Sequence, residues 1–168
     1  MISGQLPYWN TPKLEYLNLL NNQLTAVSSE LDYAHLYYLN IGYNQIAGNL
    51  PDWDFPAIKE LHAYVNQFSG ALPAFNFPVI EFFDFNHNML TGTIPDYAWP
   101  ELLYFDVSWN QLSGPMPDIS APKLKEYHLR NNQLTGDLQH LDFPDLERRY
   151  LEKNKLNGTI QTTIDFPK

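Results

Sequence analysis

The sequence contains no cysteine, and its basic residues are few: 10 lysines and arginines stand against 19 aspartates and glutamates. Without thiols the chain has no disulfide framework, no cysteine nucleophile and no zinc site built on thiolates. The net charge of -9 argues against nucleic-acid binding, because phosphates require a basic surface. There is also no long apolar run and no charged leader followed by an apolar stretch, so we expect no membrane insertion.

Repetition is what the sequence has in abundance. An asparagine recurs every 22 residues, at Asn22, Asn44, Asn66, Asn88, Asn110, Asn132 and Asn154. Apolar residues keep the same step around each of them, as Leu14, Leu17 and Leu19 do before Asn22. A fixed period of this length indicates a solenoid, in which each repeat buries its apolar side only against its neighbours.

Seven repeats follow when the first apolar residue of the pattern is taken as repeat position 1. They begin at Leu14, Leu36, Ile58, Ile80, Leu102, Leu124 and Leu146. Residues 1–13 match the back part of a further, partial repeat, and the last repeat has one extra residue near Thr162. No linker interrupts the series, so residues 1–168 are expected to form one continuous elongated domain.

Proline and glycine support this register independently. Of 13 prolines, five occupy repeat position 16 and seven stand just before the next repeat. Proline cannot donate to a β-ladder, so both places are expected to be extended backbone outside any central strand. Six glycines, from Gly48 to Gly158, share repeat position 13, which indicates a bend or a close backbone approach.

Residues 88–95 read Asn-Met-Leu-Thr-Gly-Thr-Ile-Pro, and other repeats vary this run as Asn-x-Leu-Ser/Thr-Gly-x-Leu/Ile-Pro. The run resembles the plant-type leucine-rich repeat, here shortened to 22 residues, and the resemblance covers essentially the whole chain. The resemblance implies a right-handed solenoid with a parallel β-sheet on its concave face. It also implies a role in recognition, often outside the cell.

Two features depart from the pattern of that family. Segments such as residues 52–56 and 74–78 replace the usual helical stretch, so we expect an extended, aromatic convex side with little or no α-helix. The disulfide-bonded cap modules of the family are absent. Uncapped ends favour a second hypothesis, in which the chain is a structural segment of a larger repetitive surface protein or a unit that self-associates end to end.

Alternation within each strand predicts which side chains face the core. Repeat positions 4 and 6 should point inward, with Arg149 as the one break, while positions 3, 5 and 7 should point outward into solvent. A buried amide is costly unless its donors and acceptors are bonded. The asparagines at position 9 are therefore expected to bond the loop backbone of adjacent repeats, as a structural ladder and not as a ligand site.

The outward columns form the predicted binding surface, about 30 Å long when parallel coils are spaced by about 4.8 Å. The surface is aromatic and acidic in the middle and more basic toward its C-terminal end. The candidate ligand-binding residues are Tyr38, His62, Tyr64, Phe82, Asp84, Tyr104, Asp106, Trp109 and His128. Aromatic anchors favour recognition of a protein, peptide or glycan, although cross-strand packing alone also accounts for aromatic residues on a sheet.

Catalysis and metal binding find little support. Asp84 and Asp106 share position 5 in adjacent repeats, at roughly the 5 Å separation of retaining glycosidases, but an open sheet is expected to offer no cleft that raises a carboxyl pKa. Two carboxylates provide too few ligands for calcium, and His62 and His128, about 14 Å apart, are too distant to share a metal. No glycine-rich phosphate loop or nucleophile elbow is present.

The sequence therefore predicts a non-enzymatic recognition module, without metal or cofactor, placed outside the cell or at its surface. Ice binding is a further alternative, because Thr91 and Thr93 form the kind of pair that flat threonine ladders use. The equivalent residues of the other repeats are irregular, which is unfavourable for matching a lattice.

Overall fold

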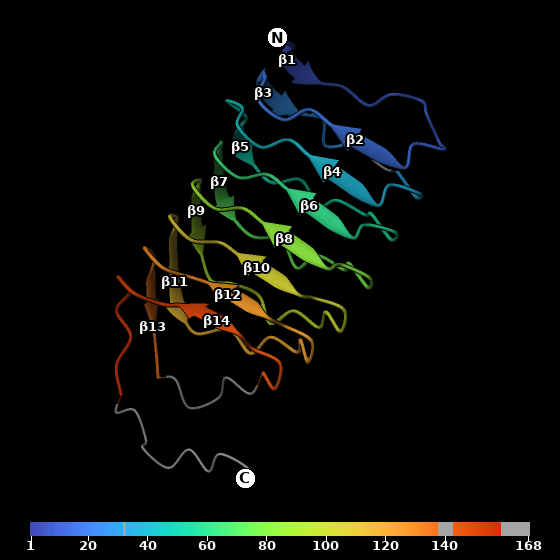
Figure 1. Cartoon of the computed structure of the whole chain (residues 1–168). Coiled ribbons are helices and arrows are strands. Elements are labelled where there is room, and N and C mark those ends of the chain that lie inside the picture. Colours follow the sequence, from blue (N-terminus) through green and yellow to red (C-terminus); the bar gives the residue numbers. More distant parts are fainter. Residues whose placement is uncertain (32, 138–142, 159–168) are drawn as a thin grey trace.

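The computed structural model describes residues 1–31, 33–137 and 143–158, and these residues fold into a parallel β-solenoid without helices (Figure 1). Each turn of the solenoid contributes one strand to a seven-stranded parallel sheet. In order along the sheet, the strands are β2 (Tyr16–Asn18), β4 (Tyr38–Asn40), β6 (Glu60–His62), β8 (Phe82–Asp84), β10 (Tyr104–Asp106), β12 (Glu126–His128) and β14 (Arg148–Tyr150). The predicted fold class is confirmed.

A second row of parallel strands runs beside the first along the solenoid (Figure 1). It consists of a pair, β1 (Ser3–Leu6) and β3 (Gln23–Val27), and a five-stranded sheet of β5 (Ala47–Asn49), β7 (Gln67–Ala71), β9 (Met89–Gly92), β11 (Gln111–Pro115) and β13 (Gln133–Thr135). The sequence did not reveal this row, since glycine and short polar residues weaken the pattern of a strand.

Equivalent repeat positions pair with one another in the seven-stranded sheet. Tyr104 of β10 is level with Phe82 of β8 and with Glu126 of β12. Residues separated by one repeat therefore lie on adjacent strands, about 4.8 Å apart. This register turns each repeat position into a column of side chains that runs along the whole solenoid.

The core consists of the inward columns. Positions 4 and 6 are fully covered in the middle repeats, where Leu39, Ile41, Leu61, Ala63, Phe83, Phe85, Phe105, Val107, Tyr127 and Leu129 are buried. Arg149 interrupts the column and is exposed, and Leu17 and Leu151 near the two ends are only partly buried. Each middle repeat thus buries its apolar side against the repeats on either side of it.

The convex side, opposite the seven-stranded sheet, is extended and aromatic, as the sequence predicted. Two adjacent columns of buried rings run along it, formed by Trp53, Phe55, Phe75, Phe77, Tyr97 and Trp99. The rings of Tyr97 and Trp99 stack at 3.8 Å, and Phe77 stacks on Trp99 at 6.1 Å. These large rings fill the space that a helix would otherwise occupy.

The position-9 asparagines tie adjacent repeats together through backbone hydrogen bonds. Oδ1 of Asn88 accepts from the N–H of Phe68 at 3.0 Å, and Nδ2 donates to the carbonyls of Ala63 and Phe85, both at 3.1 Å. The same three bonds recur at Asn44, Asn66, Asn110, Asn132 and Asn154. Asn22 bonds the backbone of Ile2 and Leu19.

None of the described segments forms a helix that could cross a membrane. The extra residue predicted near Thr162 lies outside the described residues.

Candidate functional site

The candidate site is the outward side of the seven-stranded sheet together with the turns that follow its strands. We call this surface, made of the side chains at repeat positions 3, 5, 7 and 8, the sheet face. Seven of the nine predicted residues lie on its strands: Tyr38 on β4, His62 on β6, Phe82 and Asp84 on β8, Tyr104 and Asp106 on β10, and His128 on β12. Tyr64 and Trp109 lie in the turns after β6 and β10.

The predicted residues form two groups and one separate anchor. In the first group, the ring of His62 lies 5.6 Å from Tyr38 and 6.3 Å from Tyr64. In the second, Tyr104 packs 6.0 Å from the Phe82 ring and 5.1 Å from the His128 ring. Asp84 and Asp106 are level with each other in this second group. Trp109 contacts residues that were not predicted: it stacks on His87 at 5.1 Å and lies 5.5 Å from Nζ of Lys153.

Four titratable side chains form one row across the middle of the sheet face: His62, Asp84, Asp106 and His128, on four successive strands. A glutamate stands two residues before each histidine, on the same side of its strand. Nε2 of His62 lies 3.1 Å from Oε2 of Glu60, and Nε2 of His128 lies 3.1 Å from Oε2 of Glu126. The row is therefore two carboxylates between two histidines, each histidine held by its own glutamate.

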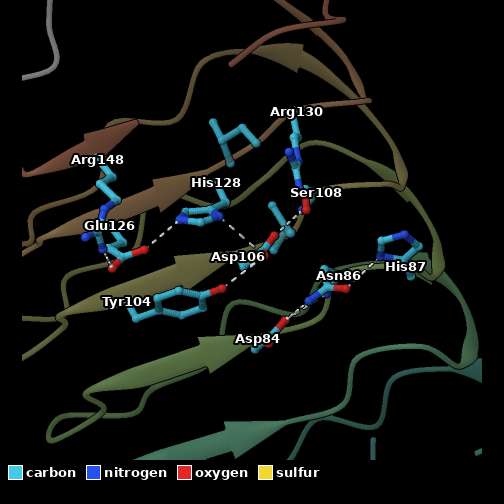
Figure 2. Close-up of polar contacts among 12 residues, drawn as sticks. Asp84, Asn86, His87, Tyr104, Asp106, Ser108, Glu126, His128, Arg130 and Arg148 are labelled. Atoms are coloured by element: carbon cyan, nitrogen blue, oxygen red, sulfur yellow. Dashed lines mark hydrogen bonds and ion pairs between the residues drawn. The ribbon is translucent and has the colours of Figure 1, made fainter. Parts of the chain in front are cut away.

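Asp106 is surrounded by hydrogen-bond donors (Figure 2). Its Oδ1 accepts from the backbone N–H of Ser108 at 2.8 Å, and its Oδ2 accepts from the hydroxyl of Tyr104 at 3.1 Å. Nδ1 of His128 lies 3.6 Å from the same Oδ2. Burial, together with the charge of Asp106, raises the pKa of Tyr104, so its hydroxyl stays a donor. Both carboxylate oxygens of Asp106 are therefore engaged by hydrogen bonds, and His128 lies beside one of them.

Asp84 accepts hydrogen bonds from the described residues on one oxygen only, whereas Asp106 accepts them on both. Oδ1 of Asp84 accepts from the backbone N–H and from Nδ2 of Asn86, at 3.1 and 2.6 Å, and no described residue donates to its Oδ2. Burial, and after it the charge of Asp106, raises the pKa of Asp84 to about 7.

Two expectations about these carboxylates are therefore wrong. Position 5 was expected to face solvent, but Asp84 and Asp106 are only 9% and 5% exposed. An open sheet was expected to leave carboxyl pKa values unchanged, yet the pKa of Asp84 is raised. The physical reason is that larger side chains of adjacent columns, such as Tyr104 beside Asp106, stand around the carboxylates and exclude water from them.

The polar row continues into the last described turn through residues that were not among the nine predicted. The guanidinium of Arg148 contacts Oε1 of Glu126, and Figure 2 shows the contacts running from Arg148 through Glu126, His128 and Asp106 to Tyr104. The sequence signal for Glu60 and Glu126 was available, because a residue two places before a histidine in a strand shares its face.

Charge on the sheet face is unevenly compensated. The cations of its C-terminal part have partners: Arg148 contacts Glu126, Arg130 lies 3.6 Å from Glu152, and Lys153 lies over the Trp109 ring. Asp84, by contrast, has no cation within ion-pair distance among the described residues. The middle of the face therefore has two carboxyl groups with no described cation paired to Asp84, and it becomes more negative when Asp84 ionises.

The turn after each strand has a left-handed backbone at position 8, which the sequence reading did not foresee. Asn21, Tyr43, Val65, His87, Trp109, Asn131 and Lys153 all have φ between 49° and 57°. Such values are uncommon outside glycine, asparagine and aspartate. Tyr43 and Trp109 are 54% and 42% exposed, so Tyr43 is a further anchor that the predicted set missed.

The aromatic rings of the sheet face stack on one another along the columns. Tyr16 and Tyr38 are 4.3 Å apart with an interplanar angle of 10°, and His87 and Trp109 are 5.1 Å apart at 18°. Phe82 and Tyr104 follow the same arrangement at 25°. Each of these rings therefore has at least one face covered by the neighbouring ring of its column.

Other features of the surface lie outside this site. A shallow groove of about 700 Å³ follows the loops before the strands and is lined by Glu15, His35, Tyr37, Pro56, Ala57, Lys59 and Val79. It contains none of the nine predicted residues. Within the described ranges, no group of three or more His, Asp or Glu side chains is placed to hold a metal ion.

Comparisons with known proteins bear on the fold more than on the ligand. No protein-family model matches the sequence, and no curated protein matches it. Among solved structures, Pollen Receptor Kinase 3 matches with 24% identity and a TM-score of 0.78, over 92% of this chain and 79% of that one. A plant ice-binding protein matches with 21% identity and a TM-score of 0.54, over 94% of this chain and 71% of that one.

A third match is the Arabidopsis receptor kinase HAESA, in complex with the peptide hormone IDA and the co-receptor SERK1. The identity is 26% and the TM-score 0.71, over 92% of this chain and 32% of that one. This chain thus spans about a third of the HAESA chain. The structural likeness and the parallel β-solenoid together show that the chain has the fold of the leucine-rich-repeat ectodomains of plant receptor kinases.

Proposed function

We propose that the sheet face binds an extended peptide or a segment of a partner protein, in a recognition module that is not an enzyme. The observation that carries the proposal is the combination of exposed aromatic anchors, Tyr43 and Trp109, with a row of polar side chains whose middle holds two carboxyl groups and no described cation paired to Asp84. Tyr and Trp contribute strongly to protein interfaces, and polar groups between them fix the register of a bound chain.

The stacked rings favour a peptide over a glycan. A sugar packs its C–H face flat on an open aromatic face, but on the sheet face Tyr16 is stacked on Tyr38 and His87 on Trp109. Ring edges, hydroxyls and carboxylates remain available, and these suit the backbone and side chains of an extended peptide. The negative middle of the face favours a partner with a basic group over β8 and β10.

The solved complexes give independent support. HAESA, which shares this fold, is seen with a peptide hormone and a co-receptor protein. Ectodomains of receptor kinases lie outside the cell, and we infer the same location for this chain. Ice binding has weaker support, because the likeness to the ice-binding protein extends to the fold alone.

The proposal is tested with a peptide array and two matched variants. The double change Tyr43→Asn and Trp109→Asn removes both anchors without straining the turn, because asparagine occupies the same left-handed position at residues 21 and 131. Each anchor contributes about 2 kcal/mol at an interface, which predicts at least a roughly hundredfold loss of affinity for any peptide the array selects. The exposed convex residue Asp52 provides the control, as Asp52→Asn.

Titration calorimetry with the selected peptide measures the three affinities. Full affinity in the double variant, together with a loss in Asp52→Asn, would move the binding site to the convex side.

A further inference from the structure

We propose that Asp84 and Asp106 form a proton-binding site in the middle of the sheet face, and that a basic group of a bound partner releases this proton. The site thus regulates the binding surface through pH. The part of the inference that concerns a partner rests on the function proposed above. The proton site itself stands on the arrangement of β8 and β10 alone.

Register and burial bring two carboxylates together where water is scarce. Asp84 and Asp106 are directly level on adjacent parallel strands, and both are at least nine-tenths buried. Two carboxylates in such a place do not both ionise without a large electrostatic cost, so one proton is retained by the pair.

The hydrogen bonds assign the proton to Asp84. Both oxygens of Asp106 are engaged by donors, from Ser108 on Oδ1 and from Tyr104 on Oδ2. On Asp84 only Oδ1 accepts hydrogen bonds, both from Asn86, and Oδ2 is left as the oxygen that carries a proton. Burial raises the pKa of Asp84 to about 7, which agrees with this geometry.

Among the residues that the structure describes, none places a positive charge at ion-pair distance from Asp84, where it would replace the proton. The titratable and charged groups that face the pair are Glu60 and His62 from β6, Tyr104 from β10, and Glu126 and His128 from β12, with Arg148 of β14 behind Glu126. Arg148 is held by Glu126, and His62 by Glu60. The histidine that reaches the pair, His128, contacts Asp106 and not Asp84.

The pH dependence follows from linkage. In the unfolded chain Asp84 loses its proton at the ordinary aspartate pKa of 3.8, whereas in the folded chain it keeps the proton up to about pH 7. Between these values the folded state binds more protons, so stability falls as the pH rises through this window and levels off above about pH 7. The fall approaches tenfold in the folding equilibrium per pH unit.

A partner's basic group adds the complementary effect. An ammonium or guanidinium group seated over the pair stabilises two ionised carboxylates, and the proton leaves to solvent. A partner of this kind therefore binds more tightly at pH 8 than at pH 5.5. A partner that is neutral over the pair does not gain affinity in this way.

The first test compares urea unfolding of the wild type, Asp84→Asn and Asp54→Asn between pH 5.5 and 8. Asparagine resembles the protonated carboxyl, so the ratio of wild-type to Asp84→Asn folding equilibria should fall by up to tenfold per unit until about pH 7. Because His62, His128 and the glutamates remain in both proteins, their titration largely cancels. The exposed convex Asp54 should give a constant ratio. A constant ratio for Asp84→Asn as well would overturn the proposal.

A second measurement needs no variant, and so decides the question even where Asp84→Asn does not fold. The carboxyl carbon of Asp84 in wild-type protein, followed by NMR, should titrate near pH 7. A midpoint below pH 5 rejects the proton site.

The partner arm repeats the peptide array at pH 5.5 and at pH 8. Basic peptides should gain signal at pH 8 on the wild type but not on Asp84→Asn. An array without any hit would count against the proposed function, whereas the unfolding and NMR results would still decide the proton site.

Discussion

At the scale of the residue, stacking of the repeats depends on the position-9 asparagine. Each amide uses its oxygen toward the preceding repeat and its nitrogen toward both the preceding repeat and its own, so a single side chain bonds backbone groups of two repeats. The period alone predicted this role, because a buried amide recurring once per coil has only the backbone of adjacent coils as partner.

We expect Asn88→Ala to lower the free energy of unfolding by about 1–3 kcal/mol. Asn88 is buried, and its loss leaves the N–H of Phe68 without a partner, at a cost of about 1–3 kcal/mol. The carbonyls of Ala63 and Phe85 each lose one donor but still accept from Asn66 and Asn110, respectively. Urea unfolding measures the change. The control is Asn76→Ala on the convex side, because Asn76 is exposed. Equal unfolding midpoints would contradict the ladder.

Asn86 is a poor control for that experiment, although its place at position 7 predicted a solvent-facing side chain. Its amide donates to Asp84 at 2.6 Å and its oxygen faces Nδ1 of His87 at 2.7 Å. Asp84 was expected to be exposed for the same reason, since its strand position also points outward. Alternation along a strand tells which way a side chain points, but not how tall the side chains of the adjacent columns are.

At the scale of the element, the turn after each strand combines a fixed backbone with a variable side chain. Every described position-8 residue is left-handed, whether it is asparagine, tyrosine or valine. The hydrophobic pattern could not reveal this, since the period records which residues are apolar and not their φ. The consequence for the site is that aromatic anchors stand on a turn whose shape is set by the repeat.

Val65 is the residue least suited to this turn, because a branched β-carbon makes a left-handed backbone costly. We expect Val65→Asn to raise the free energy of unfolding by about 1 kcal/mol, measured by urea unfolding. Val79→Asn provides the matched control, since Val79 is similarly half-buried but has no left-handed backbone. If Val65→Asn instead lowered the free energy of unfolding by as much as Val79→Asn does, strain at this turn would be negligible.

At the scale of the whole molecule, the period predicted a solenoid and the family resemblance its parallel sheet. The segments that replace the usual helical stretch predicted the aromatic convex side. A chain whose apolar residues recur in every repeat can bury them only by stacking successive repeats on one another. The repeat period could not predict which charged side chains form ion pairs on the sheet face. These pairs depend on distances between side chains of different repeats. End-to-end association stays a hypothesis, which size-exclusion chromatography at rising protein concentration would test.

The central claim is that a peptide partner occupies the sheet face, and hydroxyl-radical footprinting tests it most directly. Tyr43 and Trp109 on this face are 54% and 42% exposed, while Tyr8 and Trp9, which lie outside it, are 42% and 40% exposed. The four rings therefore start with similar access to the oxidant. With the peptide bound, oxidation should fall at Tyr43 and Trp109 and stay unchanged at Tyr8 and Trp9. Protection of Tyr8 and Trp9 with full oxidation of Tyr43 and Trp109 would contradict the account.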